Sequence, residues 1–260
     1  MRLMKFSASG REAYGIVEGD RVVEIVGDLF GSHERTKTVH ALKDVKIEIP
    51  LIPPTFYCAG LNYTMHIKES AAKLGVEPDI PKKADIGYRA VSALVAHNEP
   101  VIIPRDATEK IHYEGELVAV IGRKVKHLSE ADALSCVLGY TIGNDVSERT
   151  WQKNDRTMWR GKNTDTFKPM GPWIETSVDL DKLETMVRVN GKESTRFPTN
   201  DMLFSVATYI AAMTRYLTLY PGDVIWMGTD GSSPNIKAGD VVDVEITGIG
   251  TLTNPFVAET

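Results

Sequence analysis

The stretch His112-Tyr113-Glu114-Gly115-Glu116-Leu117-Val118-Ala119-Val120-Ile121-Gly122 determines how the rest of the chain is interpreted. Its second half, Leu117 to Ile121, is an uninterrupted apolar run of strand length that ends at a glycine. Such a run is typical of a strand that is buried on both faces. Residues two apart in a strand point to the same side, so Glu114 and Glu116 are expected to share one face with His112.

The two carboxylates at the start of this strand require an explanation. Paired acids in a strand ordinarily form a solvated face, but the buried run that follows Glu116 argues against exposure here. Buried like charges about 4 Å apart repel by several kcal/mol at an effective dielectric constant near ~20 unless a cation neutralises them. We therefore predict a divalent metal site whose remaining ligands lie elsewhere in the chain.

Composition excludes several classes of function. The chain has 260 residues, of which 42% are hydrophobic and 25% charged, as in ordinary globular proteins. A net charge of −5 provides no basic surface for nucleic acid or anionic lipid. Neither a membrane-spanning run nor a signal peptide is evident in the sequence. The two cysteines, Cys58 and Cys136, are far apart and are expected to be buried free thiols, so we expect a cytoplasmic protein without nucleic acid or membrane partners.

The chain is expected to divide into two units. Residues 1–50 form a small β-rich unit with a hairpin at Tyr14–Val17 and Val22–Ile25, and residues 51–260 form the larger domain after a run of prolines. In that domain we predict helices over 64–75, 129–138 and 201–217, and strands over 55–60, 139–145, 187–189, 223–229 and 241–246. Short strands and few helices indicate a β-dominated α+β fold.

Eight motifs follow one another along the larger domain: Cys58-Ala59-Gly60-Leu61-Asn62-Tyr63, His66-Ile67-Lys68-Glu69, Tyr113-Glu114-Gly115-Glu116-Leu117, Gly139-Tyr140-Thr141-Ile142-Gly143-Asn144-Asp145-Val146-Ser147, Arg160-Gly161-Lys162-Asn163-Thr164-Asp165, Pro169-Met170-Gly171-Pro172-Trp173, Pro221-Gly222-Asp223-Val224-Ile225 and Gly248-Ile249-Gly250-Thr251-Leu252-Thr253-Asn254-Pro255. In these motifs the chain from Phe56 to Phe256 resembles the fumarylacetoacetate hydrolase superfamily, and residues 1–48 match only loosely. The resemblance implies the mixed β-roll with few helices that characterises the family's C-terminal domain.

By this resemblance, Glu114, Glu116 and Asp145 would be the metal ligands, in agreement with the independent prediction from the acidic strand. Three carboxylates completed by water suit a hard divalent cation, so Mg²⁺ is expected, with Mn²⁺ and Ca²⁺ as alternatives. Zinc would favour Cys or several His ligands, and none match.

The resemblance also assigns roles to residues outside the metal site. A His-x-x-Glu pair is ordinarily a surface contact, but His66 and Glu69 match a family pair on a helical lid that deprotonates water. Lys162 would stabilise the charge of an enolate or oxyanion. Thr229 would contact a substrate oxygen, and Asn62 and Tyr63 would lie under the lid as further substrate contacts.

The chain departs from the family pattern at two places. Many relatives carry a lysine where this chain has Tyr88-Arg89-Ala90, and the sequence after Thr229 is Asp230-Gly231-Ser232-Ser233-Pro234-Asn235. We hypothesise that Arg89 binds a substrate carboxylate through both ends of its guanidinium group. Substrates of individual relatives therefore do not transfer directly to this chain.

The resemblance implies a Mg²⁺-dependent hydrolase that cleaves a carbon–carbon bond of a small 2,4-dioxo acid, of the acylpyruvate or fumarylpyruvate type, through an enolate stabilised by the metal. The first alternative is an isomerase or decarboxylase of a 2-oxo-enol diacid, of the 2-hydroxyhepta-2,4-diene-1,7-dioate or oxaloacetate type. The second is a non-catalytic metal-binding domain. The family resemblance also implies a homodimer.

Overall fold

The buried run at Leu117–Ile121 lies in β11 (Gly115–Ile121), where every residue is buried. In this computed structural model the backbone is described over residues 1–260, and side chains are described for all residues except His66, Ser70, Lys73 and Leu74. β11 pairs antiparallel with β12 (Val137–Asn144) on one side and with β17 (Val224–Trp226) on the other. The strand expected to be covered on both faces is therefore an inner strand of a sheet.

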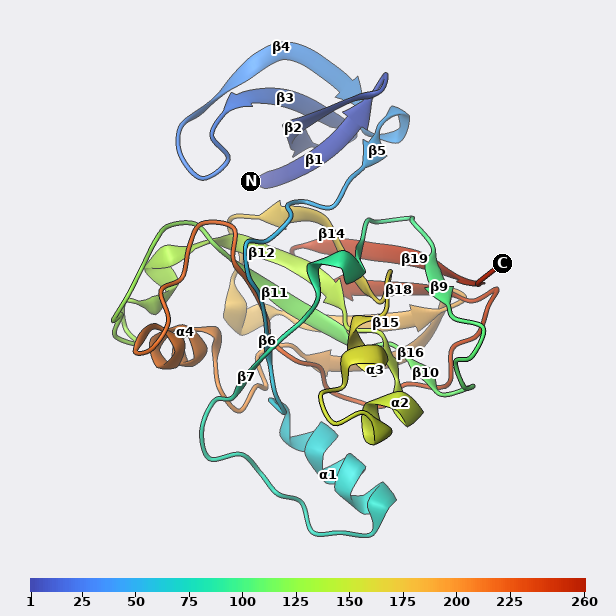
Figure 1. Cartoon of the computed structure of the whole chain (residues 1–260). Helices are drawn as coiled ribbons and strands as arrows, with labels where there is room; N and C mark the ends of the chain where they lie inside the picture. Colours follow the sequence, from blue (N-terminus) through green and yellow to red (C-terminus); the bar gives the residue numbers. More distant parts are fainter.

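The larger sheet carries β11 in its interior (Figure 1). Its strands follow the order β4-β3-β2-β1-β14-β12-β11-β17-β6-β7, with β5 paired to β1 and β8 paired to β14. The pairs β17–β6 and β14–β8 are parallel. The remaining bounds are β1 (Arg2–Ala8), β2 (Arg11–Glu18), β3 (Arg21–Gly27), β4 (His33–Ala41), β5 (Lys46–Ile47), β6 (Phe56–Ala59), β7 (Ile86–Tyr88), β8 (Leu94–Val95) and β14 (Lys168–Glu175).

A second sheet covers one face of the β11 region. Its order is β16-β15-β18-β19-β9, with bounds β9 (Val101–Ile103), β15 (Glu184–Val189), β16 (Lys192–Pro198), β18 (Val241–Ile246) and β19 (Gly250–Ala258). Leu117 and Ile142 of the larger sheet share a buried apolar cluster with Val187, Val244 and Leu252 of the second. The two sheets thus enclose the main core, which confirms the β-dominated α+β fold with a layered, rolled β-structure.

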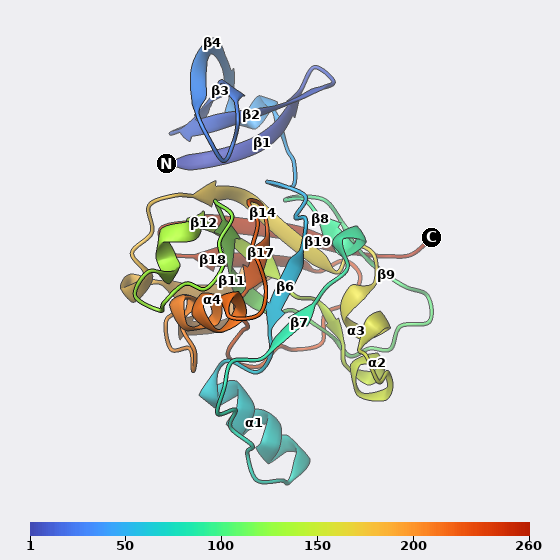
Figure 2. The same ribbon diagram turned by 60° about the vertical axis from the view of Figure 1, so that its left-hand side comes forward.

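The first fifty residues continue the larger sheet at its edge. β1 pairs with β14 through Arg2–Glu175 and Leu3–Ile174, and β2 and β3 form the predicted hairpin. Figures 1 and 2 show these strands standing above the rest of the molecule. The sequence did not indicate β4, because its side chains are exposed or half-buried and lack an apolar alternation. The division of the chain at residue 50 stays a prediction.

The helix α1 (Thr64–Leu74) has the bounds expected from the sequence. Gly75 ends it in the left-handed conformation at φ 67°, and its N–H donates to the carbonyls of Ala71 and Ala72. Ile67 and Ala71, four residues apart on one face, are buried. In both views α1 projects from the end of the molecule opposite the first fifty residues.

Two helix predictions were wrong in extent. Ser129 and Asp132 form the predicted capping hydrogen bonds, but only a 3₁₀ turn, η3 (Ala133–Cys136), follows before β12 begins. The helix expected over 201–217 is the shorter α4 (Val206–Thr214), whose N-cap is Ser205. Its predicted first turn is absent from the described backbone because Leu203 and Phe204 donate to Asn62 instead.

The remaining short elements complete the chain between the strands. They are α2 (Arg149–Asn154), α3 (Trp159–Asn163), β10 (Ile111–His112), β13 (Ser147–Glu148), η1 (Leu42–Asp44), η2 (Val91–Ala93) and η4 (Leu180–Lys182). Both cysteines are free and buried, as predicted, and burial raises the pKa of the Cys58 thiol to about 12. Within the described residues, no helix has the length and apolar character needed to cross a membrane.

Candidate metal centre

The register between β11 and β12 brings three carboxylates together. Gly115 pairs with Asn144, so Glu114 and Glu116 on either side of Gly115 face Asp145, which directly follows β12. Two further hydrogen bonds close this end: the Asp145 N–H donates to the Glu114 carbonyl at 2.8 Å, and the Glu114 N–H donates to Asn144 Oδ1 at 3.0 Å. The site is thus built on the rigid ends of adjacent strands.

The three carboxylates form a compact set of oxygen donors. One oxygen from each of Glu114, Glu116 and Asp145 lies within 4.8 Å of the others, and the residues are 7%, 3% and 3% exposed. Hard divalent cations prefer such ligands, and a neutralising cation removes the repulsion between buried carboxylates. The donor set therefore fits a divalent metal ion, as the sequence predicts.

Four basic side chains surround this set. Lys162 from α3 donates to Glu114 and, at 3.0 Å, to Asp145 Oδ2. Arg89, which follows β7, places Nη2 3.0 Å from Asp145 Oδ2, and Arg149 at the start of α2 places Nη2 2.7 Å from Glu114 Oε1.

The fourth basic group is Lys168, the first residue of β14. Its Nζ lies 2.7 Å from Asp145 Oδ1 and its side chain is completely buried. Burial lowers the pKa of Lys168 to about 8, and Asp145 opposes this shift. The Asp145 carboxylate therefore favours the protonated form of Lys168.

The protein compensates the carboxylates unequally. Burial alone would raise the pKa of Asp145, but Arg89, Lys162 and Lys168 hold it well below its usual range. Burial and the neighbouring Asp145 and Glu114 raise the pKa of Glu116 to about 8, although the Gly228 N–H donates to its Oε2 at 2.8 Å. A bound cation would therefore stabilise the charged form of Glu116 more than that of Asp145.

A small cavity opens onto the carboxylates. Its volume is about 200 Å³, and it adjoins a cavity of about 640 Å³ that shares Glu114, Arg149 and Thr229 in its lining. The sequence-predicted residues that line the small cavity are Asn62, Arg89, Glu114, Glu116, Asp145, Lys162 and Thr229. These candidates, from segments far apart in the sequence, meet at one place.

Asn62 and Tyr63 are engaged with the protein itself. Asn62 Nδ2 donates to the carbonyls of Met227 at 2.9 Å and Phe204 at 3.2 Å, and its Oδ1 accepts from the Phe204 N–H at 3.0 Å. Tyr63 is 1% exposed and donates its hydroxyl to the Thr199 carbonyl at 2.6 Å. Tyr63 is outside the set of residues lining the small cavity, so the structure brings Asn62 to the site and places Tyr63 behind it.

The predicted proton-transfer pair lies on α1. Glu69 lines the larger cavity, whose lining also includes Thr229 and Asp230. The side chain of His66 lies outside the described residues, so its role remains the prediction made from the sequence. His112, first expected on the acidic face, instead accepts from Arg149 Nε at 3.1 Å and contacts Asn235.

The sequence reasoning missed Arg149, Gln152 and Lys168. Arg149 Nη1 donates to Gln152 Oε1 at 2.8 Å, and both side chains line the two cavities. Their spacing of three within a helix was a usable signal, because such residues are neighbours on one face. Lys168 had no such signal, since its neighbours Phe167 and Pro169 indicate only a buried strand.

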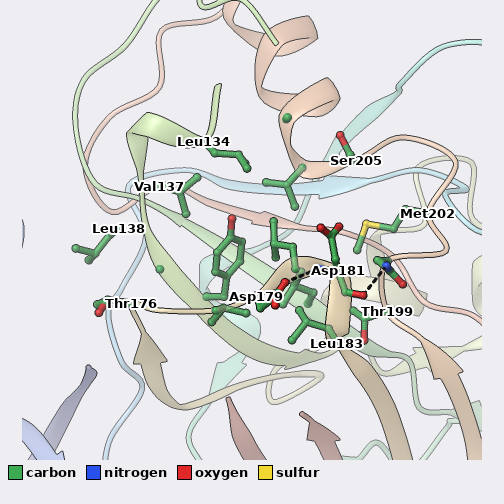
Figure 3. A pocket seen from close by; sticks show the side chains of 18 residues that line it. Leu134, Val137, Leu138, Thr176, Asp179, Asp181, Leu183, Thr199, Met202 and Ser205 are labelled. Atoms are coloured by element: carbon green, nitrogen blue, oxygen red, sulfur yellow. Dashed lines mark hydrogen bonds between the residues drawn. The ribbon is translucent and has the colours of Figure 1, made fainter. Parts of the chain in front are cut away.

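Another cavity, of about 610 Å³, lies on the other side of β11 (Figure 3). Leu117, Tyr140 and α4 residues contribute to it, whereas Glu116 points to the opposite face of the strand. Its described lining contains no lysine or arginine, and Asp179 accepts from the Asp181 N–H at 3.2 Å within its own turn. Basic side chains beside carboxylates are therefore a feature of the small cavity and not of the described lining of this one.

Comparison with known proteins agrees with this geometry. A family model described as "Fumarylacetoacetate (FAA) hydrolase C-terminal" matches residues 55–257, and one described as "Rv2993c-like, N-terminal" matches residues 1–50.

The chain is 35% identical to 2,4-didehydro-3-deoxy-L-rhamnonate hydrolase of a Sphingomonas species, covering 96% of this chain and 94% of the relative. It is 33% identical to the oxaloacetate tautomerase YisK of Bacillus subtilis, covering 92% and 84%. The crystal structure of 5-carboxymethyl-2-hydroxymuconate delta-isomerase from Mycobacterium smegmatis superposes with a TM-score of 0.90 at 36% identity and complete coverage of both chains.

Proposed function

We propose that this chain, which belongs to the fumarylacetoacetate hydrolase family, is a Mg²⁺-dependent enzyme that cleaves a carbon–carbon bond in a small 2,4-dioxo acid of the acylpyruvate type. One observation carries the proposal: the buried carboxylates of Glu114, Glu116 and Asp145 meet beside Lys162 in a small cavity lined by basic side chains. Relatives of the family include enzymes named as hydrolase, isomerase and tautomerase, which share a need to form or stabilise an enol.

Glu114, Glu116 and Asp145 would hold the metal through oxygen atoms, which is the ligand type that Mg²⁺ prefers. A bound divalent cation would supply Lewis-acid polarisation of the substrate's 2-oxo group and adjacent carboxylate. The closeness and burial of the three carboxylates support this assignment.

Two arginines are candidates for binding an acidic substrate. Arg89 and Arg149 both line the small cavity, and each contacts a carboxylate of the site, Asp145 and Glu114 respectively. A guanidinium group binds a carboxylate through two parallel hydrogen bonds, so a substrate carboxylate would replace the present partner of either arginine. The 2-oxo acid end would occupy the small cavity and the distal acyl group the adjoining larger one.

In the proposed reaction, His66 and Glu69 carry out proton transfer and Lys162 stabilises the negative charge that develops. His66, oriented by Glu69, takes a proton from water while the water oxygen bonds to the distal carbonyl carbon. The carbon–carbon bond then breaks, its electron pair becomes the enolate of the 2-oxo acid fragment, and protonation of carbon completes the two acidic products. Lys162 stabilises the enolate charge, because its ammonium group lies beside the carboxylates at 3.0 Å from Asp145.

The second candidate is an enol–keto isomerase that uses the same groups without water attack. Two observations favour it: the Bacillus subtilis relative is named an oxaloacetate tautomerase, and the Mycobacterium smegmatis structure is that of a delta-isomerase. In this case Lys162 would stabilise the same enolate, and His66 would move a proton between carbon and oxygen. The two candidates differ in whether a carbon–carbon bond is broken.

The test is a panel of acylpyruvates and oxaloacetate, assayed with metal-stripped protein to which Mg²⁺ is returned, with products identified by mass spectrometry. Pyruvate plus a second carboxylic acid in equal amounts supports the hydrolase. Decay of enol absorbance with no change of mass supports the isomerase instead. Retention of activity by Glu116→Gln without added metal would contradict both assignments, because this substitution removes a proposed ligand.

A further inference from the structure

Lys168 is a buried cation that does not line the cavity on which the proposed reaction depends. Its side chain is completely buried, and its Nζ lies 2.7 Å from Asp145 Oδ1 and 2.9 Å from each of the carbonyl oxygens of Val146 and Phe167. An ammonium group has three N–H donors, and here each has an acceptor. Lys168 is therefore fixed in position by a complete set of hydrogen bonds.

This arrangement gives the two oxygens of Asp145 different surroundings. Oδ1 is held from the protein interior by Lys168 at 2.7 Å, and Arg89 Nε lies farther away, at 3.5 Å. Oδ2 lies 3.0 Å from both Arg89 Nη2 and Lys162 Nζ, and these two side chains line the small cavity. With its inner oxygen fixed by a buried ammonium, Asp145 would offer its outer oxygen, Oδ2, to a metal ion in the cavity. A metal ion that also contacted Oδ1 would approach the buried charge of Lys168, at a high electrostatic cost.

Glu116 is restrained in a similar way, since the Gly228 N–H donates to its Oε2 at 2.8 Å. A backbone amide is a weaker restraint than an ammonium group because it carries no net charge. Glu114 is held by two side chains that line the cavity, Lys162 and Arg149, whereas Lys168 holds its ligand oxygen from the protein interior.

We propose that Lys168 is a specificity-determining residue that limits Asp145 to one metal-facing oxygen and thereby selects Mg²⁺ over Ca²⁺. This inference rests on the proposed metal site at the triad. Mg²⁺ takes about six oxygens in a small octahedral shell, whereas Ca²⁺ takes about six to eight and commonly uses both oxygens of a carboxylate. A site in which each carboxylate offers one oxygen leaves room for water to complete the octahedral shell of Mg²⁺, but it gives Ca²⁺ fewer carboxylate oxygens than it commonly uses.

The experiment measures cation affinity directly, without turnover. Metal-stripped wild-type protein and the variants Lys168→Met and Lys168→Arg are titrated with MgCl₂ and with CaCl₂ in a calorimeter. Wild type should bind Mg²⁺ with a dissociation constant about tenfold or more below that for Ca²⁺. In Lys168→Met, which frees Oδ1, the Ca²⁺ constant should fall relative to the Mg²⁺ constant by about tenfold.

Lys168→Arg is the matched control, because it changes the same position but keeps a cation beside Oδ1. It should leave the ratio of the two dissociation constants close to that of wild type. An equal ratio in wild type and Lys168→Met would overturn the selectivity role and leave Lys168 as a structural ion pair. If Lys168→Met does not fold, the wild-type ratio decides, since Ca²⁺ binding as tight as Mg²⁺ contradicts the proposal. Absence of binding by either ion would instead overturn the metal site itself and the inference with it.

Discussion

Replacing Asn62 with alanine is expected to destabilise the protein and, through the fold, to disturb the metal site. Asn62 is 2% exposed and makes three hydrogen bonds to backbone groups, at 2.9 and 3.2 Å as donor and at 3.0 Å as acceptor. These bonds join the loop after β6 to Phe204, ahead of α4, and to Met227, after β17. Gly228, the residue after Met227, donates to Glu116, so loosening this junction also loosens a proposed ligand.

The magnitude follows from these three bonds. A buried hydrogen bond contributes about 1 kcal/mol on average, so Asn62→Ala should lower the free energy of unfolding by about 3 kcal/mol. For a protein of this size, each kcal/mol corresponds to about 2 to 4 °C in melting temperature, so a decrease of about 6 to 12 °C is expected. The substitution also removes side-chain volume, which adds to the loss rather than offsetting it.

Urea unfolding followed by circular dichroism provides the measurement, with the midpoint decreasing and the slope unchanged. Asn200→Ala is the matched control, because Asn200 is exposed and donates a single hydrogen bond, to the Asp181 carbonyl at 3.1 Å. It should cost less than about 1 kcal/mol. If Asn62→Ala keeps wild-type stability but loses substrate affinity, Asn62 is a substrate contact, as the sequence predicts, and its three hydrogen bonds do not hold the junction together.

Three further predictions concern separate parts of the molecule. Lys162→Met should lower kcat by about a hundredfold or more in steady-state assays with saturating metal, because it removes the proposed stabiliser of enolate charge. Gly143→Ala should lower the free energy of unfolding by about 1 to 3 kcal/mol in urea, because the added methyl would lie 2.5 Å from Trp226 Cζ3. His97 accepts a hydrogen bond from the Thr253 N–H at 3.1 Å, and burial lowers its pKa. Neutral His97 therefore adds its full contribution to the free energy of unfolding above the unfolded pKa of about 6.5. That contribution is lost as the pH falls from there through the folded pKa. Wild type should therefore lose more stability between pH 7.5 and 5.5 than His97→Asn, which keeps an acceptor but does not titrate.

Each of these predictions has a defined contrary result. An unchanged kcat in Lys162→Met would remove that residue from the reaction. Gly60→Ala is the control for Gly143→Ala, because its added methyl would lie 3.6 Å from Asp85 in ordinary contact, and equal losses in the two variants would contradict the packing explanation. Parallel pH profiles of wild type and His97→Asn would show that His97 is not responsible for the acid-side loss.

Much of the candidate site was predictable because its proposed ligands lie in local patterns. Glu114 and Glu116 precede a buried apolar run at a spacing of two, and Asp145 follows a strand that ends at Asn144. Local spacing of this kind survives folding, since a strand places alternate residues on one face whatever it packs against. The hairpin at Tyr14–Val17 and Val22–Ile25 was also predictable from local sequence, and the structure has it as β2 and β3.

Features that depend on contacts between distant segments could not be predicted from the sequence. α4 begins at Val206, after its N-cap Ser205, rather than near residue 200, because Asn62, far back in the chain, binds the backbone that would have formed its first turn. The sequence did not indicate that Arg89 contacts Asp145, because that contact depends on how β7 and the end of β12 come together in the fold; its binding of a substrate carboxylate stays a prediction. Nothing in the sequence around Lys168 indicated its contact with Asp145, because that contact arises only when β14 pairs with β12.

The balance of charge at the site provides a further guide to the substrate. Four basic side chains, Arg89, Arg149, Lys162 and Lys168, contact two of the three carboxylates directly, so the protein alone already carries more positive than negative charge there. A bound divalent cation would increase that excess to three positive charges. A dioxo acid with two carboxylates, which becomes more negative still as its enolate forms, would neutralise this excess better than a monoacid. For the proposed enzyme, this charge balance predicts a higher kcat/KM for dicarboxylate substrates than for the corresponding monoacids, which steady-state assays on matched pairs would measure.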